Sequence, residues 1–409
     1  MQADAVIVGG GAAGFFAAIQ CKAARPDARV IILEKSRKLL AKVRISGGGR
    51  CNVTHACFDP RQLTSHYPRG HRELLGPFHR WNPTHTVDWF AARDVPLKTE
   101  SDGRMFPTTD SSQTIIDALL DEARSLGVDI RTECGLAAAE PVDNGFDLTC
   151  TTGDPIHTRS LMLATGGLHA SIGMKTAAAL GHTISPPVPS LFTFNIKHPL
   201  LKDLPGLSVT PVVARIEGCK SLVQEGPLLI THWGLSGPAI LKLSAWGARE
   251  LADRAYDFTV VINWLGPQSP EETASQIASF RTARSKQAIH NKSPFPPIPR
   301  RLWERMVELA GIPSGTPWAQ LTKPAAQALA DILSRSRLPV SGKSTNKEEF
   351  VTCGGVQLNE IDMKTFESRK HPGLFLAGEM IDIDGVTGGF NFQAAWTGGT
   401  LAGQAMAER

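Results

Sequence analysis

The sequence predicts an α/β fold in which a Rossmann-like domain is interrupted by an inserted β-rich domain and a small helical subdomain. A glycine motif between an apolar strand and a helix opens the chain, short β segments with turns begin near residue 186, and a strand with a small-residue helix closes it. We therefore expect residues 1–187 and 346–409 to form one domain, with a β-rich insert over 188–265 and a helical, basic insert over 266–345.

The N-terminal stretch DAVIVGGGAAG predicts a strand over residues 4–8, a glycine turn and a helix. Gly9 permits the tight turn, Gly11 lets the backbone approach a pyrophosphate, and Gly14 lets the helix lie close to the sheet. A second buried strand ends at Glu34, twenty residues beyond Gly14. An acid at this place accepts hydrogen bonds from both hydroxyls of an adenosine ribose. The stretch predicts a dinucleotide site; the alternative is a glycine turn in another kind of α/β protein.

Three later segments favour FAD over NAD, because FAD is longer and its flavin end extends beyond the first glycine motif. ISGGGRCN offers backbone amides and basic side chains to a pyrophosphate or to the flavin edge, and LMLATGG is an apolar strand that ends in a small-residue turn. Near the C-terminus a strand ends at Gly378, Asp382 and Asp384 follow, and a helix begins near Asn391 after two glycines. A carboxylate there would hold the ribityl hydroxyls, unless it lies in a solvated turn. The helix N-terminus would stabilise negative charge on reduced flavin.

These segments supply the predicted cofactor contacts. They are Gly9, Gly11, Ala12, Ala13, Gly14, Glu34, Lys35, Ser46, Gly47, Gly48, Gly49, Arg50, Cys51, Asn52, Ala164, Thr165, Gly166, Gly378, Glu379, Asp382, Gly388, Gly389, Phe390 and Asn391.

Seven stretches resemble bacterial NAD(P)/FAD-dependent oxidoreductases of the BaiN/RdsA type, also called YhiN-like. The stretches are GGGAAG, ISGGGRCNVT, SDGRMFPTTDSS, LATGG, EGPLLITHWGLSGPAIL, TCGGVQL and GLFLAGEMIDIDGVTGGFNFQAAWTGG, and they extend from one end of the chain to the other. The resemblance implies a FAD-binding Rossmann-like domain built from both chain ends. It also implies reductive flavin chemistry, with uracil in ribosomal RNA and steroid-like molecules among the family's substrates. Two departures are a longer link before SGGGR and Cys353 at a place where small residues are common.

The rest of the chain completes the expected domains. Residues 112–126 predict a helix and 128–134 a strand of the first domain; within the inserts, residues 239–251 predict a helix, and 267–338 are expected to be helical with proline-rich breaks. FVTCGGVQL returns the chain to the first domain. A second GxGxxG with its strand and helix is absent, so we expect NAD(P)H to act as a transient electron donor.

Composition excludes several classes of protein. The 409 residues are 42% apolar and 20% charged, as in soluble globular proteins. We expect no signal peptide, because a strand starts close to Met1, and no membrane span, because no apolar run approaches roughly 18 residues. Seven cysteines without a CxxC pair predict neither disulfides nor a metal site, and a reducing cytoplasm is the expected location.

Positive charge is concentrated in the helical insert. Residues 266–350 hold twelve Lys and Arg against seven Asp and Glu, so this region carries +5, although the whole chain carries only +4. One acid, Glu304, lies among seven basic residues: Arg281, Arg284, Lys286, Lys292, Arg300, Arg301 and Arg305. This pattern predicts either contact between residues 281–305 and the phosphates of RNA, or the solvated face of a basic helix.

Three residues are candidates for catalysis beside the flavin. Cys51 is a possible proton donor or a small packed residue, His232 a site histidine or a loop cap, and Arg104 an anion clamp or the partner of an acid. The main functional prediction is a FAD-dependent reductase of an electron-poor double bond, in RNA or in a small molecule. The alternatives are a flavoprotein oxidase and a non-enzymatic RNA-binding flavoprotein.

Overall fold

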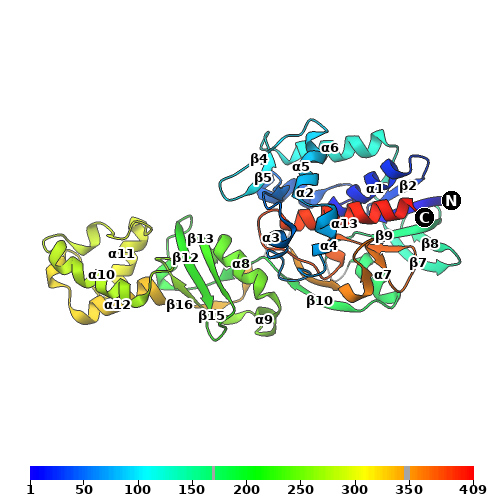
Figure 1. Ribbon diagram of the computed structural model, residues 1–409. Coiled ribbons are helices and arrows are strands. Elements are labelled where there is room, and N and C mark those ends of the chain that lie inside the picture. The colour runs from blue at the N-terminus through cyan, green and yellow to red at the C-terminus, as the bar shows by residue number, and fades with distance from the viewer. Residues whose placement is uncertain (168–170, 345–350) are drawn as a thin grey trace. The chain divides into compact units, whose positions relative to one another are not determined.

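The computed structural model describes residues 1–167, 171–344 and 351–409, and the chain divides into two compact units. Unit 1 comprises Met1–Pro189 and Lys347–Arg409, and unit 2 comprises Ser190–Asn346. Figure 1 shows unit 1 with helices α1 to α7 and α13, and unit 2 with helices α8 to α12. The expected boundary between residues 345 and 346 lies outside the described residues.

Unit 1 is built on a sheet with the order β19-β20-β21-β9-β1-β2-β6, and the hairpin of β7 and β8 adds to β9. Strands β21, β9, β1, β2 and β6 pair in parallel. The bounds are β1 Gln2–Val8, β2 Val30–Leu33, β6 Asp129–Arg131, β7 Leu136–Val142, β8 Gly145–Cys150, β9 Ile156–Leu163, β19 Ile361–Asp362, β20 Glu367–Ser368 and β21 Leu374–Leu376. The parallel core with helical crossovers confirms the predicted Rossmann-like α/β class.

Two smaller sheets and eight helices complete the described part of unit 1. The strands are β3 Thr54–His55, β4 Leu97–Thr99 and β5 Arg104–Pro107 in one sheet, and β10 Ile184–Pro189 with β18 Thr352–Val356 in the other. The helices are α1 Ala12–Ala24, α2 Ala41–Gly49, α3 Pro60–Thr64, α4 Leu75–Arg80, α5 Pro83–Ala91, α6 Ser112–Ser125, α7 Ile172–Ala179 and α13 Phe390–Ala407. Since β18 pairs with β10, the chain returns to unit 1 at the predicted stretch.

The two ends of the chain meet where α1 packs against α13. A Cβ at Gly399 would lie 2.5 Å from the carbonyl oxygen of Ala13, and one at Gly403 would lie 2.3 Å from that of Ala17. The helix backbones therefore approach too closely for any larger residue at either glycine. Figure 1 shows the blue α1 and the red α13 side by side.

Unit 2 contains an antiparallel sheet with the order β16-β15-β12-β13-β14-β11-β17 and five α-helices. The strands are β11 Thr193–Asn195, β12 Ser208–Ile216, β13 Val223–Ile230, β14 Gly234–Ser236, β15 Asp257–Asn263, β16 Ser336–Ser341 and β17 Lys343–Ser344. The helices are α8 Pro238–Trp246, α9 Ala248–Asp253, α10 Pro270–Ala283, α11 Arg300–Leu309 and α12 Lys323–Arg335.

Two sequence predictions in unit 2 need correction. The helix expected over residues 239–251 is two helices that meet at Gly247. The helical prediction was also wrong for residues 336–338, which belong to β16, because Ser336, Leu338 and Val340 alternate inward along a strand.

One hydrophobic core extends through the β-rich and the helical parts of unit 2. It includes Phe258 of β15, Trp264 just after β15, Trp303 of α11 and Leu329 of α12. The predicted division between the two inserts is therefore not visible as a break in this core. In neither unit is any described helix both long enough and apolar enough to cross a bilayer.

Candidate functional site

Topology brings four predicted cofactor segments to one edge of the unit 1 sheet. Strands β1, β2, β9 and β21 run parallel, so their carboxyl ends lie at the same edge. The segments that follow these ends contain Gly9 after β1, Glu34 after β2, Ala164 after β9 and Gly378 after β21. In open α/β sheets ligands bind outside these carboxyl ends.

The glycines of the first motif have different surroundings. Gly9 has φ +117°, and a Cβ there would lie 2.3 Å from the carbonyl oxygen of Ala164. At Gly14 a Cβ would lie 2.1 Å from the carbonyl oxygen of Gly9, so the helix start is packed against the turn. At Gly11 a Cβ would meet no described atom within 4 Å. Gly9 and Gly14 are thus required by the chain itself, whereas Gly11 borders open space at the start of α1.

Glu34 contacts the first glycine loop through one carboxylate oxygen and the turn after β2 through the other. One oxygen accepts a hydrogen bond from the backbone N–H of Gly10 at 2.9 Å, and the other from Ser36 at 2.9 Å. Lys35 beside it is exposed. The acid is therefore positioned next to the loop that would carry the pyrophosphate, as a ribose-binding carboxylate requires.

We expect Glu34→Gln to weaken FAD retention by about 1.5–3 kcal/mol, because a charge-assisted bond to the ribose becomes neutral. Equilibrium dialysis or flavin fluorescence on the purified variant measures this change. Glu133→Gln is the matched control, since Glu133 pairs with Arg37 at 2.7 Å and its side chain is 57% exposed. Equal FAD affinity in both variants would show that Glu34 serves only the loop backbone.

The second glycine loop forms the end of α2 and does not continue its helical geometry. Gly47 has φ +59°, Gly48 +69° and Gly49 +85°. A Cβ at Gly48 or Gly49 would meet no described atom within 4 Å, whereas one at Gly47 would lie 2.8 Å from the Phe106 ring. The Ser46 hydroxyl donates to the carbonyl of Val43 at 3.0 Å. Two adjacent glycines with open surroundings leave backbone amides accessible, which suits an anion.

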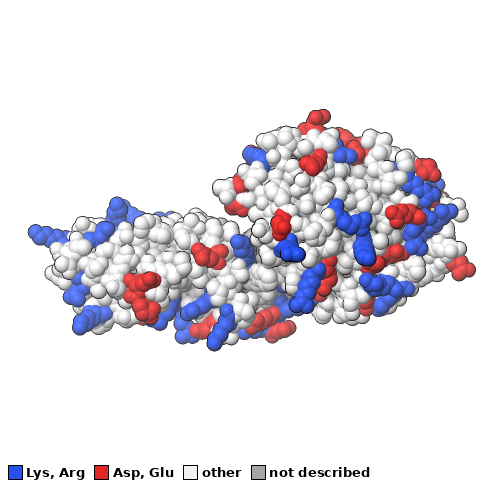
Figure 2. All heavy atoms as spheres, viewed as in Figure 1, with Lys and Arg blue, Asp and Glu red and all other residues white. Residues whose placement is uncertain are grey.

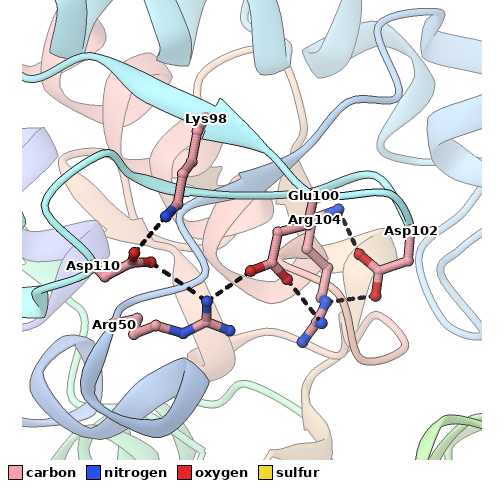
Figure 3. Close-up of polar contacts among 6 residues, drawn as sticks. All are labelled: Arg50, Lys98, Glu100, Asp102, Arg104 and Asp110. Atoms are coloured by element: carbon pink, nitrogen blue, oxygen red, sulfur yellow. Dashed lines mark hydrogen bonds and ion pairs between the residues drawn. The ribbon is translucent and has the colours of Figure 1, made fainter.

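Arg50 and Arg104 belong to one ionic network (Figure 3), whose other members are Lys98, Glu100, Asp102 and Asp110. Arg50 donates to Glu100 at 2.6 Å and lies over the Phe106 ring, 4.0 Å from its centroid. Arg104 donates to Glu100 at 3.0 Å and to Asp102 at 2.7 Å. Arg104 therefore makes the acid pairing that was its alternative role, and a contact between Arg50 and a pyrophosphate stays a prediction.

Cys51 and Asn52 lie inside the protein. Cys51 is fully buried, and burial raises the pKa of its thiol to about 12. A thiol with so high a pKa is a weak acid at neutral pH. The Asn52 carboxamide, in the orientation that satisfies both neighbours, accepts from the Gly389 N–H at 3.0 Å and donates to the Thr54 carbonyl at 3.0 Å. Asn52 therefore ties the second glycine loop to the C-terminal glycines.

The two C-terminal aspartates have different surroundings. Asp384 is fully buried and forms a two-pronged ion pair with Arg69, which donates through both Nε and a terminal nitrogen. Its role is therefore structural. Asp382 donates its backbone N–H to Val356 at 3.0 Å. Glu379, three residues after β21, pairs with Lys42 in the first turn of α2 at 2.8 Å.

The N-terminus of α13 is shaped by Gly388 and Gly389, with φ +130° and +93°. Phe390 lies against two histidines, with ring centroids 4.7 Å from His55 and 4.2 Å from His66, and the two histidine rings are themselves 5.9 Å apart. The Asn391 carboxamide closes the preceding loop through two 2.8 Å hydrogen bonds to the backbone of Gly385. The stack of His55, Phe390 and His66 was not predicted, because nothing in the local sequence relates residues more than 300 positions apart.

His232 lies in unit 2, at the tip of the hairpin between β13 and β14, and its side chain is exposed. The sequence predicted it as the best-placed histidine beside a glycine–serine loop, but Gly234 and Ser236 belong to strand β14 rather than to a loop. Its participation in catalysis stays a prediction.

The glycine loops at the carboxyl edge of the unit 1 sheet fit a long dinucleotide. A Cβ at Gly166, as at Gly11, Gly48 and Gly49, would meet no described atom within 4 Å. Gly11 follows β1, Gly48 and Gly49 follow β2, and Gly166 follows β9. Glu34 lies beside the loop that contains Gly11. Thr165 is held by Met380 through a contact of 3.1 Å between its hydroxyl and the sulfur. Glycine amides at several loops, together with the Glu34 carboxylate, would provide the donors and the acceptor that a dinucleotide requires.

Comparison with known families decides the assignment. The family described as HI0933-like protein Rossmann domain matches residues 3–405. The chain belongs to this family. Two relatives match most of the chain. The ribosomal RNA dihydrouridine synthase of Escherichia coli strain K12 is 33% identical over 96% of this chain and 95% of its own. The 3-dehydro-bile acid delta(4,6)-reductase of Clostridium scindens is 31% identical over 98% of both chains.

A solved structure supports the fold. The 3-ketosteroid-delta4-(5alpha)-dehydrogenase of Rhodococcus jostii RHA1 is 15% identical, with a TM-score of 0.56 over 100% of this chain and 97% of its own. The predicted resemblance to the BaiN/RdsA type is confirmed, and this HI0933-like protein is a FAD-dependent oxidoreductase. Among the described residues, no group of three or more His, Cys, Asp or Glu side chains is arranged to hold a metal ion.

Proposed function

We propose that this protein is a cytoplasmic reductase that acts on the electron-poor double bond of uracil in ribosomal RNA, with NAD(P)H as a transient electron donor. Bound FAD would supply the hydride. The protein itself must then bind the RNA, orient the base and supply a proton. One relative of 33% identity carries the name of this activity, and another of 31% identity carries the name of a bile acid reductase, so a feature of this chain must favour one substrate.

The basic region of unit 2 is the observation that favours RNA. No acid lies between Glu272 and Glu304, whereas this stretch contains six basic residues. Arg281, Lys286 and Lys292 are exposed, and none of them forms an ion pair within the described residues. Figure 2 shows more blue than red side chains at the end of unit 2 formed by α10 to α12. An apolar steroid-like substrate would gain no electrostatic attraction from such a surface, whereas the phosphates of RNA would.

Several arginines of the predicted basic patch already have partners within the protein. Arg300 pairs with Glu304 at 2.7 Å, Arg305 donates to the Pro199 carbonyl at 2.8 Å, and Arg301 donates to the carbonyl of Asp203. The Arg284 guanidinium lies over the ring of Phe280. These side chains already have partners in the protein. The basic residues without ion pairs, Arg281 in the last turn of α10 and Lys286 and Lys292 after it, are therefore the better candidates for phosphate contact.

The test is to reduce the flavin under anaerobic conditions and to mix the protein with bulk ribosomal RNA. Recovery of the oxidised flavin spectrum together with dihydrouridine in the RNA supports the proposal, and poly(A) should give neither. Recovery with a steroid enone alone would make a small-molecule reductase the better description. Recovery with oxygen alone would indicate an oxidase. The rates of reduction by NADH and NADPH identify the donor.

RNA affinity should weaken linearly with salt on logarithmic scales, with a slope of about −0.7 per phosphate contact on single strands. We expect Arg281→Gln together with Lys286→Gln to flatten this slope by about one to one and a half units. The control pair is Arg335→Gln with Arg337→Gln, because these arginines are paired with Asp331 and Glu217 at 2.5 and 2.6 Å. A slope that is the same in both double variants would mean that the basic segment is only a solvated surface.

Of the three catalytic candidates, we favour His232 as the proton donor, because Cys51 is buried and Arg104 is paired with two acids. His232→Asn should slow flavin reoxidation by RNA in stopped-flow absorbance without lowering the flavin content. An unchanged rate across the pH range would exclude His232 from proton transfer.

A further inference from the structure

We propose that Trp233, at the hairpin tip of unit 2, is a stacking platform for a base of single-stranded RNA; this inference rests on the proposed function. This residue is 67% exposed, more than any other large hydrophobic residue in the described chain. Tryptophan is enriched among the residues that dominate the binding energy of interfaces.

The backbone of this exposed residue is held firmly. The carbonyl of Trp233 accepts from the Ile196 N–H at 2.8 Å, and its own N–H donates to the Thr231 hydroxyl at 3.2 Å. Gly234 admits no side chain, since a Cβ would lie 2.2 Å from the carbonyl oxygen of Phe194. The strands on either side thus fix a two-residue tip, and the indole projects from a rigid support. A rigid aromatic ring loses little conformational entropy when a flat ligand stacks on it.

The charges around the tip favour a polyanion. No acid lies between Glu225 and Glu250, a stretch that contains the whole hairpin tip and α8. The adjoining segment, residues 196–202, contributes the exposed Lys197 and Lys202 and no acid. RNA phosphates next to a stacked base would therefore meet the cations of these segments, and the exposed Asp203 is the first acid beyond them.

The same segment leads from the tip to α11. Ile196 bonds to the tip, and Asp203, seven residues later, bonds to Arg301 through its carbonyl. This path can span at most about 25 Å, from the reach of an extended chain. It ends at a polar groove of about 840 Å³ whose lining holds three arginines and three acids: Arg300, Arg301, Arg305, Asp203, Glu304 and Glu308. One short RNA strand can therefore reach both the aromatic tip and the groove.

The test compares two short fluorescein-labelled strands of equal length in an anisotropy titration of the flavin-loaded protein. One strand is an oligouridylate, and the other has the same backbone without bases. Trp233→Ala should weaken oligouridylate binding by about 5- to 150-fold, the range of one lost stacked base, and should leave abasic binding unchanged. Trp233→Phe should recover most of the loss.

Trp246→Ala is the matched control, because Trp246 lies at the end of α8 in the same unit and is 40% exposed. It should change neither titration. Two outcomes would overturn the stacking inference without affecting the proposed RNA function. One is equal oligouridylate affinity in wild type and Trp233→Ala, and the other is an equal loss of affinity for both strands. If the wild-type protein binds neither strand at low salt, the proposed RNA function fails instead.

Discussion

Gly11→Val should yield a folded but colourless protein. The backbone at Gly11 has φ −99° and ψ −170°, an extended conformation that valine adopts readily. A Cβ there meets no described atom within 4 Å, so the chain itself accommodates the new side chain. The added methyl groups would instead occupy the space in which a pyrophosphate approaches the start of α1. We expect FAD binding to be abolished, as measured by the ratio of flavin to protein absorbance.

Gly76→Val provides the control for this substitution. A Cβ at Gly76 also meets no described atom within 4 Å, and Gly76 lies in α4, outside all the predicted cofactor segments. This variant should retain its flavin. Circular dichroism and thermal melting in saturating FAD separate loss of binding from loss of folding. A yellow Gly11→Val protein with normal flavin content would remove the first glycine motif from the cofactor site.

Arg69→Met should cause the largest loss of stability. Asp384 is fully buried, and removal of its partner leaves a carboxylate in the interior. Breaking one side of a buried ion pair costs about 3–5 kcal/mol. The melting temperature of the flavin-loaded protein should therefore fall by on the order of 10 °C. Differential scanning calorimetry measures this change.

Two further variants make the Arg69 experiment specific. Arg335→Met breaks a pair with Asp331 whose side chains are 46% and 45% exposed, and such a pair contributes less than about 1 kcal/mol. Arg69→Met combined with Asp384→Leu should recover part of the loss, because no buried charge then lacks its partner. A melting temperature for Arg69→Met as high as that of Arg335→Met would contradict a stabilising role for the buried pair.

The strongest sequence predictions concerned features whose cause is local. The first motif specified a strand, a turn that only glycine accepts at Gly9, and a helix that packs over Gly14, and all three are present. The position of Glu34 at the end of the second strand was likewise determined by its neighbours in the chain. Local conformational preference and the alternation of buried residues act over a few positions, so a single sequence reveals them.

The surroundings of the site residues required the tertiary structure. From the sequence, Asp382 and Asp384 were equivalent candidates, and only the approach of Arg69, 315 residues away, makes Asp384 a buried ion-pair member. Arg104 was predicted to be an anion clamp or an acid partner. Its partners Asp102 and Glu100 lie only two and four residues before it, and the conformation of the β4–β5 turn brings them together.

The sequence by itself determined that both chain ends carry glycine segments suited to one dinucleotide, and that a basic insert lies between them. Tertiary structure decided that Cys51 is buried, that the two inserts share one core, and that Trp233 is exposed on a rigid tip. The physical reason is that burial, ion pairing and exposure depend on which distant residues come within a few ångströms of one another, and a linear pattern does not contain those distances.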